Sequence, residues 1–204
     1  PDGDVIAPGT VIISAACECS DVSKVIEPVL KKNGGNIYHI NLSGDAYKLG
    51  GSSFSQVLNA IGNEVPDIKD AASFKNTFNV IQELIKAGKI TSGHDIGSGG
   101  LITTLLEMSF PTMDLGADYD LTGLQEPDTV KALFAENIAI VIQADAILEA
   151  ELAANNVVFT KIGRPKEGRV ITIKNGNDNI NFDIPEARDS WFRTSYLLDR
   201  KQSG

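Results

Sequence analysis

The sequence predicts an α/β fold of the α+β type, a three-layer α/β/α sandwich with a mixed central sheet. Helical and strand patterns alternate through the first part of the chain, whereas strand patterns cluster after residue 156. Asn175-Gly176-Asn177-Asp178 is a strong hairpin signal between two of the clustered strands. Alternation favours a sheet covered by helices, and the clustered strands argue against a purely parallel, doubly wound sheet.

The first part of the chain is expected to hold two strands with a helix between them. Residues 10–18 are β-branched and apolar, which predicts a buried strand. Ser20 or Asp21 then caps a helix with apolar residues on one face, and Pro28 should kink that helix or end it early. Residues 36–42 show the alternation of a strand with at least one buried face.

The middle of the chain is expected to hold three helices and a short strand. Residues 49–61 place glycines before serines, which predicts a Ser-capped helix. Residues 67–87 form a long amphipathic pattern that Gly88 ends. Residues 89–93 are expected as a short strand, and residues 101–110 carry apolar residues at helical spacing.

The last part of the chain alternates short strands and helices before the strand cluster. Residues 137–143 are the most strand-like segment of the chain, since they combine β-branched and apolar residues. Residues 185–200 are expected as a helix with proline in its first turn. The other expected strands are 113–119, 157–162, 169–174 and 180–184, and the other expected helices are 128–134 and 145–155.

The composition is that of an ordinary globular chain with an acidic balance. The chain has 204 residues, of which 42% are hydrophobic, and this length indicates one large domain or two small ones. Its formal net charge is −9, which argues against nucleic-acid binding. No apolar run approaches the roughly 20 residues that span a bilayer, so no membrane partner is expected. We expect residues 1–9 to be a linker from a preceding domain and residues 10–204 to form one domain of a larger enzyme.

The cysteines and the isolated histidine carry no strong signal of chemistry. Cys17 and Cys19 are poorly spaced for a disulfide, and two thiols without a disulfide framework favour a reducing, cytoplasmic location. A metal role for them is disfavoured because the other ligands are lacking. His39 is expected to be a packed or half-exposed strand residue.

The strongest candidate for chemistry is His94-Asp95-Ile96-Gly97-Ser98-Gly99-Gly100-Leu101, between a predicted strand and a predicted helix. Glycines there let the backbone approach a ligand and direct N–H groups at it, and the helix start favours an anion. An aspartate just upstream can hold a metal ion that neutralises phosphate. We therefore expect Asp95 as a metal ligand, and Gly97, Ser98, Gly99 and Gly100 as nucleotide-binding residues. The same letters also serve any sharp strand-to-helix turn.

Other polar and aromatic residues have ordinary structural interpretations beside functional ones. Glu107 and Glu136 are expected in solvated or capping roles. The run 50–53 precedes a helix and suits either an anion or tight helix packing. Trp191 and Phe192 are expected as core or interdomain contacts.

Five segments, in order and over nearly the whole chain, resemble one family. They are similar to the second C-terminal-type domain of the large, multidomain phosphoribosylformylglycinamidine synthases, in the aminoimidazole ribonucleotide synthetase superfamily. The segments are VIISAACECSDVSKVIEPVL (11–30), LGGSSFSQ (49–56), HDIGSGGLITTLLEM (94–108), VKALFAENIAIVIQ (130–143) and DSWFRTSYLLDR (189–200).

The resemblance implies a fold like that of the C-terminal domain of aminoimidazole ribonucleotide synthetase, and a part in purine biosynthesis. The implied enzyme is an ATP-dependent C–N ligase that converts formylglycinamide ribonucleotide, glutamine and ATP to formylglycinamidine ribonucleotide. Its implied partners are the remaining synthetase and glutaminase domains and the purine-pathway nucleotide substrate. The implied cofactors are Mg²⁺ and ATP or ADP, in an auxiliary half-site that another domain completes. No catalytic residue is assigned in this chain, which should be inactive alone.

The carried-over motif is His-Asp-x-Ser-Asp-Gly-Gly-Leu, in which the aspartate ligates Mg²⁺ and the serine contacts the nucleotide. Asp95 holds the metal-ligand position, but Gly97 stands at the serine position and Ser98 at the next aspartate position. Gly97 offers only its backbone N–H, and Ser98 is a possible substitute one residue on. Two alternatives stay open: a purely architectural domain, and another superfamily member of the selenophosphate synthetase or hydrogenase-maturation type.

Overall fold

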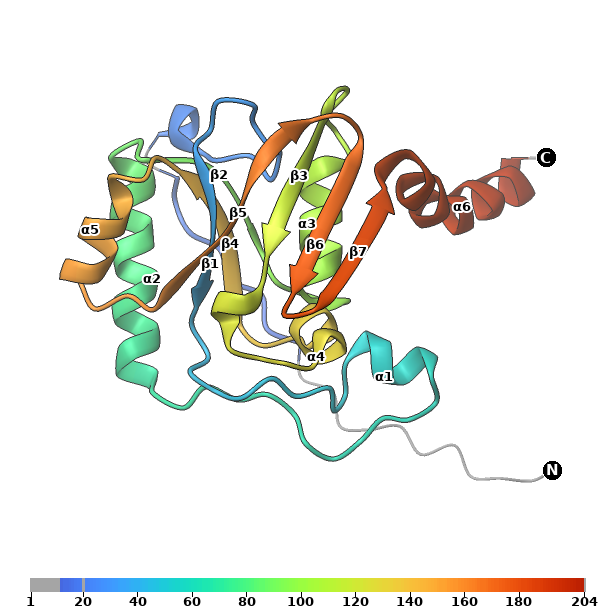
Figure 1. The fold of residues 1–204 in the computed structure, drawn as a ribbon, viewed down its shortest axis with the longest axis horizontal. Helices are drawn as coiled ribbons and strands as arrows, with labels where there is room; N and C mark the ends of the chain where they lie inside the picture. The colour runs from blue at the N-terminus through green and yellow to red at the C-terminus, as the bar shows by residue number, and fades with distance from the viewer. Residues whose placement is uncertain (1–11, 20, 204) are drawn as a thin grey trace.

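The computed structural model describes residues 12–19 and 21–203, and within them seven strands form one mixed sheet (Figure 1). Among these strands only β3 and β6 pair in parallel. The strands in sheet order are β2 (Ile90–Asp95), β4 (Ala139–Ala144), β1 (Asn36–Asn41), β5 (Phe159–Glu167), β3 (Leu115–Asp120), β6 (Val170–Asn175) and β7 (Asp178–Asp183). The predicted mixed α/β fold is confirmed.

Helices cover both faces of the sheet. Helices α2 and α5 pack on one face and helices α3 and α4 on the other, and Figure 1 shows α2 and α5 together at one end of the molecule. The α-helices are α1 (Ser53–Val57), α2 (Ala71–Lys86), α3 (Gly100–Ser109), α4 (Thr129–Phe134), α5 (Leu148–Ala154) and α6 (Ile184–Ser203), and short 3₁₀ turns lie at Val22–Lys24 and Thr122–Leu124.

Two apolar cores result, because successive strand residues point to opposite faces. On β1, Ile37 faces the core under α3, whereas Tyr38 and Ile40 face the core under α2 and α5. Helix α3 supplies Leu105 and Met108, both with no exposed surface, to the first core. This packing fixes α3 on the sheet, and with it the turn that leads into α3.

Local signals locate most element ends. Asp128 caps α4, with its carboxylate accepting from the N–H groups of Val130 and Lys131 at 2.9 and 3.2 Å. The predicted hairpin is confirmed, since Asn175 pairs with Asp178 between β6 and β7. The long amphipathic helix is also confirmed, but it begins at Ala71 after the cap Asp70 instead of near residue 67.

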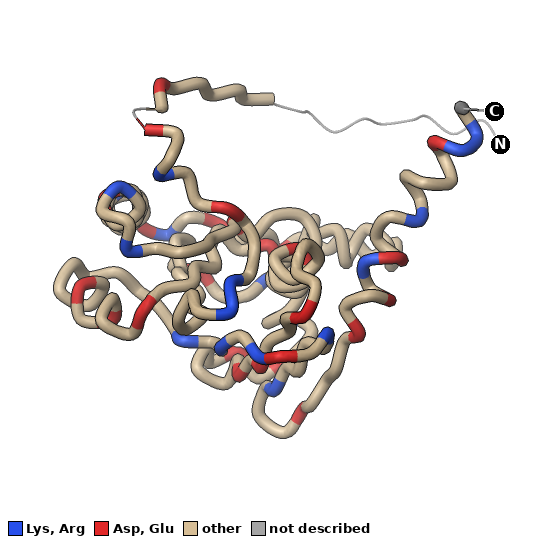
Figure 2. The backbone as a smooth tube through the Cα atoms, turned by 90° about the horizontal axis from the view of Figure 1, so that it is seen from above, with Lys and Arg blue, Asp and Glu red and all other residues tan. Residues whose placement is uncertain are grey.

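The predicted buried strand at 10–18 is wrong for the part that the structure describes. Residues 12–19 have no regular structure, and their backbone runs away from the body of the domain (Figure 2). All of them are exposed, with Ile12 at 87% and Ile13 at 86%. An apolar, β-branched run indicates burial, but a strand forms only when it pairs with another strand, and residues 12–19 pair with none of the seven described strands. The predicted linker, residues 1–9, lies outside the described residues.

The helix predicted after residue 21 is much shorter than expected. Asp21 does cap it, accepting from the Ser23 N–H at 3.0 Å, but only the single turn Val22–Lys24 forms. The ring of a proline clashes with the carbonyl four residues earlier in a helix. A helix that began at Val22 therefore could not continue through Glu27 and Pro28, and the observed turn ends before them, at Lys24.

The last helix leaves the body of the domain. Its start packs on α3, where the Trp191 and Phe110 rings lie 6.1 Å apart, and its end projects away (Figure 1). Trp191 and Phe192 were expected to make either core or interdomain contacts. Each is 50% exposed, so neither is a core residue. Among the described residues, no helix is long and apolar enough to cross a membrane.

Truncating the core under α3 should destabilise the fold. Leu105→Ala removes a side chain with no exposed surface, so we expect the free energy of unfolding to fall by about 2–5 kcal/mol. Leu58→Ala, at a leucine that is 60% exposed, should change it by less than about 0.5 kcal/mol. Urea denaturation followed by circular dichroism measures both, and equal effects would contradict the assigned core.

Candidate functional site

The glycine-rich motif forms the turn between β2 and α3. Strand β2 extends two residues further than expected and ends at Asp95, and α3 begins at Gly100. Two hydrogen bonds fix the path between them: the Ile96 N–H donates to the Ala139 carbonyl at 2.9 Å, and the Thr104 hydroxyl donates to the Asp95 carbonyl at 3.0 Å. Asp95 is thus the last residue of β2, and it immediately precedes the turn that leads into α3.

Two of the glycines are required by the backbone. Gly99 and Gly100 have φ of +90° and +72°, a region that L side chains rarely adopt. A Cβ on Gly100 would lie 2.7 Å from the Leu133 carbonyl oxygen, and one on Gly99 would lie 2.2 Å from the Thr103 hydroxyl. The turn therefore needs glycine at both positions whether or not it binds a ligand.

Gly97 has no such requirement. Its φ is not positive, and a Cβ there would meet nothing closer than Asp95 Oδ2 at 4.0 Å. A serine at this position, as in the family motif, would fit without strain. The same measurement places the Asp95 carboxylate directly beside the turn.

The four predicted nucleotide-binding residues fall into two pairs. The Gly99 N–H donates to Glu136 Oε1 at 2.8 Å, and the Gly100 N–H donates to the Gly97 carbonyl at 3.0 Å. Within residues 12–19 and 21–203, the N–H groups of Gly97 and Ser98 have no hydrogen-bond partner. Gly97 and Ser98 are also exposed, so their N–H groups are the donors that remain for an anion.

His94 lies between two carboxylates. Its Nδ1 is 3.2 Å from Asp95 Oδ1, and its Nε2 is 3.2 Å from Glu107 Oε2. A neutral imidazole donates to one of them and a protonated one to both. Glu107 was expected as a solvated or capping residue, but its side chain is only 29% exposed and contacts His94.

The donor set for a metal ion is incomplete in this chain. The Asp95 side chain is 82% exposed, and among the described residues no group of three or more histidine, cysteine or acidic side chains is arranged to hold a metal. Mg²⁺ is commonly held by one or two carboxylates, with phosphate and water completing the shell. Asp95 fits such a partial site and does not make a complete one.

A second glycine-rich turn lies against the first through Glu136. Ser52 caps α1, as predicted, by accepting from the Ser55 N–H at 3.2 Å. Glu136 Oε1 accepts from the Ser53 N–H at 2.8 Å, and the same oxygen accepts from Gly99. The capping role expected of Glu136 is confirmed, but its two targets, far apart in the sequence, were not predicted.

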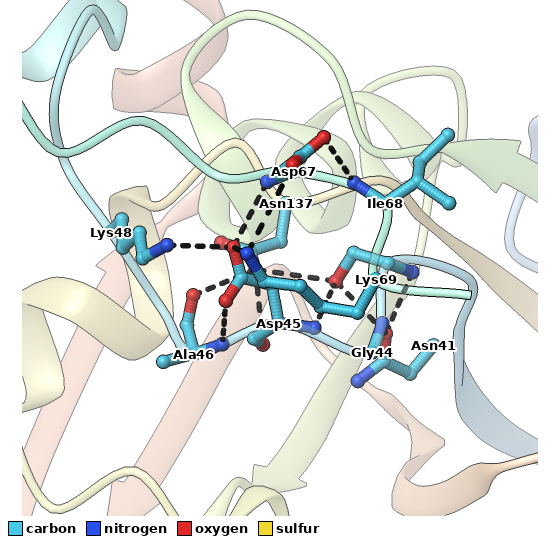
Figure 3. A network of polar contacts seen from close by, with 10 residues as sticks. Asn41, Gly44, Asp45, Ala46, Lys48, Asp67, Ile68, Lys69 and Asn137 are labelled. Carbon is cyan, nitrogen blue, oxygen red and sulfur yellow. Dashed lines mark hydrogen bonds and ion pairs between the residues drawn. The ribbon is translucent and has the colours of Figure 1, made fainter. Parts of the chain in front are cut away.

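A buried ionic network next to these turns was missed by sequence reasoning (Figure 3). The Asp45 side chain is 7% exposed and accepts from Lys48 Nζ at 2.8 Å and from the Ala46 and Asp67 N–H groups at 2.9 and 3.0 Å. Lys69 Nζ lies 3.4 Å away. The hydrogen bond from Lys48 is the largest cause that lowers the pKa of Asp45 to about 2. The i, i+3 spacing of Asp45 and Lys48 was the available signal.

Asn137, which follows Glu136 in the sequence, is hydrogen-bonded to the loop that contains Asp45. Its Nδ2 donates to the Ala46 carbonyl at 3.0 Å and to the Ser43 hydroxyl at 3.3 Å.

His39, on β1, is buried as a packed strand residue, and burial lowers its pKa to about 4. An imidazole that is neutral at pH 7 and buried in the core supports the structural interpretation of His39.

Comparison with known proteins places this geometry in a family. Residues 34–174 match the family model described as AIR synthase related protein, C-terminal domain. A probable phosphoribosylformylglycinamidine synthase of Arabidopsis thaliana, named as chloroplastic/mitochondrial, is 35% identical over 98% of this chain and 15% of its own length. The human phosphoribosylformylglycinamidine synthase is 30% identical over 98% of this chain and 16% of its own length. The chain therefore spans about one sixth of the relatives that it matches.

Solved structures share the fold. Phosphoribosylformylglycinamidine synthase II of Thermotoga maritima superposes with a TM-score of 0.61 at 16% identity, covering 80% of this chain and 27% of that chain. A hydrogenase maturation protein in complex with ATP superposes with a TM-score of 0.53 at 19% identity, covering 78% and 53%. At these identities the likeness establishes the fold alone.

The two kinds of glycine in the turn should respond differently to substitution. Gly97→Ser should change the free energy of unfolding by less than about 0.5 kcal/mol, because its Cβ enters open space. Gly100→Ala should lower it by more than about 1 kcal/mol, because of its positive φ and its close carbonyl contact. Thermal and urea denaturation of both variants measure this, and equal tolerance at the two positions would refute the turn geometry.

The Asp45 network should make stability depend on acidity. The pKa of Asp45 is lowered from 3.8 to about 2 in the folded chain, so its ionised form stabilises the fold above about pH 4, and this contribution is lost as pH falls toward 2. Asp45→Asn should therefore be less stable than the wild type at pH 7, with a difference that shrinks between pH 4 and 2. Asp189→Asn, at a side chain that is 78% exposed, is the control. A difference independent of pH would contradict the assignment.

Proposed function

Because this chain belongs to the family of AIR synthase-related C-terminal domains, we propose that it works as one domain of a large phosphoribosylformylglycinamidine synthase. Its similarity to one segment of much longer synthases supports this proposal. The whole enzyme would transfer the amide nitrogen of glutamine to formylglycinamide ribonucleotide at the expense of ATP. Its remaining synthetase and glutaminase domains would be the partners of this one.

Within that enzyme, the β2–α3 turn would supply half of a Mg²⁺–nucleotide site. One observation carries this role: the exposed Asp95 carboxylate lies beside the Gly97–Ser98 backbone, whose two N–H groups have no partner in the described chain. Peptide N–H groups just before a helix start favour an anion, and the helix dipole adds to the attraction. ATP or ADP phosphate is the anion that fits such donors.

Each residue would have a distinct task in this half-site. Asp95 would hold the metal ion, which when bound neutralises phosphate charge. Gly97 and Ser98 would donate their N–H groups to phosphate oxygens. His94, placed between Asp95 and Glu107, would fix the orientation of the Asp95 carboxylate.

The open position of the turn supports a site shared with another domain. Asp95, Gly97 and Ser98 are exposed at the surface, and a nucleotide held only there would keep most of its surface in water. Ligand sites normally bury most of a ligand, and they often lie at domain interfaces. A neighbouring synthetase domain would therefore supply the other wall and the missing metal ligands.

A second candidate role is purely architectural. The motif already satisfies part of its own polar groups, since Glu136 accepts from Gly99 and His94 contacts Asp95. On this reading the turn is a packed joint between β2 and α3 and binds nothing. Nucleotide binding by the complete enzyme separates the two roles.

The nucleotide role predicts a loss of affinity when Asp95 is replaced. In the full-length enzyme, Asp95→Ala should weaken retention of Mg-ADP by about tenfold or more, since a metal ligand is lost. Glu83→Gln, which removes one exposed carboxylate on α2, should leave retention unchanged. Isothermal titration calorimetry measures both, and unchanged affinity after Asp95→Ala would favour the architectural role.

A further inference from the structure

One carboxylate oxygen holds the two glycine-rich turns together. Glu136 Oε1 accepts from the Ser53 N–H at the start of α1 and from the Gly99 N–H just before α3, at 2.8 Å in both cases. Glu136 itself comes from the short connection between α4 and β4. Three segments that are separate in the sequence therefore meet at a single atom.

We propose that Glu136 is a positioning residue that locks the α1 turn and the α3 turn into one unit and, together with the hydrogen bond from the Gly100 N–H to the Gly97 carbonyl, restricts the direction of the free Ser98 N–H. This inference rests on the proposed nucleotide half-site for its functional consequence. The lock itself is a property of the chain without any ligand.

The geometry of the peptide unit carries the argument. The Gly99 N–H belongs to the peptide plane that also contains the Ser98 carbonyl, and peptide planes are rigid. Fixing that N–H on Glu136 fixes the plane, and Gly99, at φ +90°, would otherwise be free to rotate. The preceding peptide plane contains the Ser98 N–H and the Gly97 carbonyl, and that carbonyl accepts from the Gly100 N–H at 3.0 Å. With the planes on both sides of Ser98 held, the Ser98 N–H has a restricted range of directions. A phosphate ligand would meet a donor that is already oriented.

The charge of Glu136 makes the lock strong. Hydrogen bonds from N–H groups to a carboxylate are stronger than those to a neutral oxygen. The donor at Gly99 immediately precedes α3, so it lies at the positive end of that helix dipole. A glutamine at this position would keep an acceptor oxygen but lose the charge.

Two apolar and backbone contacts bring the same three segments together independently of Glu136. The rings of Phe54 on α1 and Phe134 at the end of α4 stack with centroids 4.6 Å apart. The backbone of Gly100 lies against Leu133 and Phe134 so closely that a Cβ would be 2.7 Å away. These contacts hold the segments near one another when Glu136 is replaced. The variants are therefore expected to fold.

The lock is tested first without ligand, on the 204-residue chain. In ¹⁵N-edited NMR spectra, Glu136→Ala should move the amide proton resonances of both Ser53 and Gly99 upfield, because both lose the same acceptor. Glu136→Gln should restore part of both shifts, and Glu83→Gln should move neither. A change at only one amide, or at none, would overturn the lock.

The functional consequence is tested on the full-length enzyme by calorimetry with Mg-ADP. Glu136→Ala should weaken retention by about tenfold, comparable to the loss of one charge-assisted hydrogen bond, and Glu136→Gln should recover most of it. If Asp95→Ala weakens retention and Glu136→Ala does not, the positioning role is overturned. If Asp95→Ala has no effect, the proposed nucleotide site fails, and the NMR result still decides whether Glu136 locks the turns.

Discussion

The close approach of the start of α3 to the last residues of α4 is the constraint on which the candidate site depends. The backbone of Gly100 touches the carbonyl of Leu133, at a separation that excludes any side chain. The core residues of α3 hold the helix on the sheet, and this contact sets where its first turn lies. The positions of Asp95 and of the Gly97–Ser98 N–H groups follow, because only four residues separate the end of β2 from the start of α3.

The connection between α4 and β4 organises more than this turn. Glu136 ties the starts of α1 and α3, and its neighbour Asn137 ties the loop around Asp45 through hydrogen bonds to the Ser43 hydroxyl and the Ala46 carbonyl. Asn137 Oδ1 is buried without a partner among the described residues.

The sequence could predict what local chemistry determines and little of what distant contacts determine. The cap at Asp128, the hairpin at Asn175–Asp178 and the cap of α1 depend on neighbours within a few residues, and all were readable. Glu136 binds groups 83 and 37 residues away, and no spacing rule encodes that. Residues 12–19 show the converse error, since β-branched residues indicate a strand but do not determine whether it pairs with another strand, and these residues pair with none of those described.

Gly97 is where the sequence and the structure together say more than either alone. The family motif has serine at this position, whereas the glycine-rich segment here also suits a sharp turn that requires glycine. The structure shows no such demand, because φ is not positive and a Cβ would enter open space. The glycine therefore removes a hydroxyl without improving the turn. What remains for a ligand is two backbone N–H groups and one carboxylate. The direction of the Ser98 N–H, which Glu136 and the Gly100–Gly97 hydrogen bond restrict together, therefore matters more here than in a site where a serine side chain makes the contact.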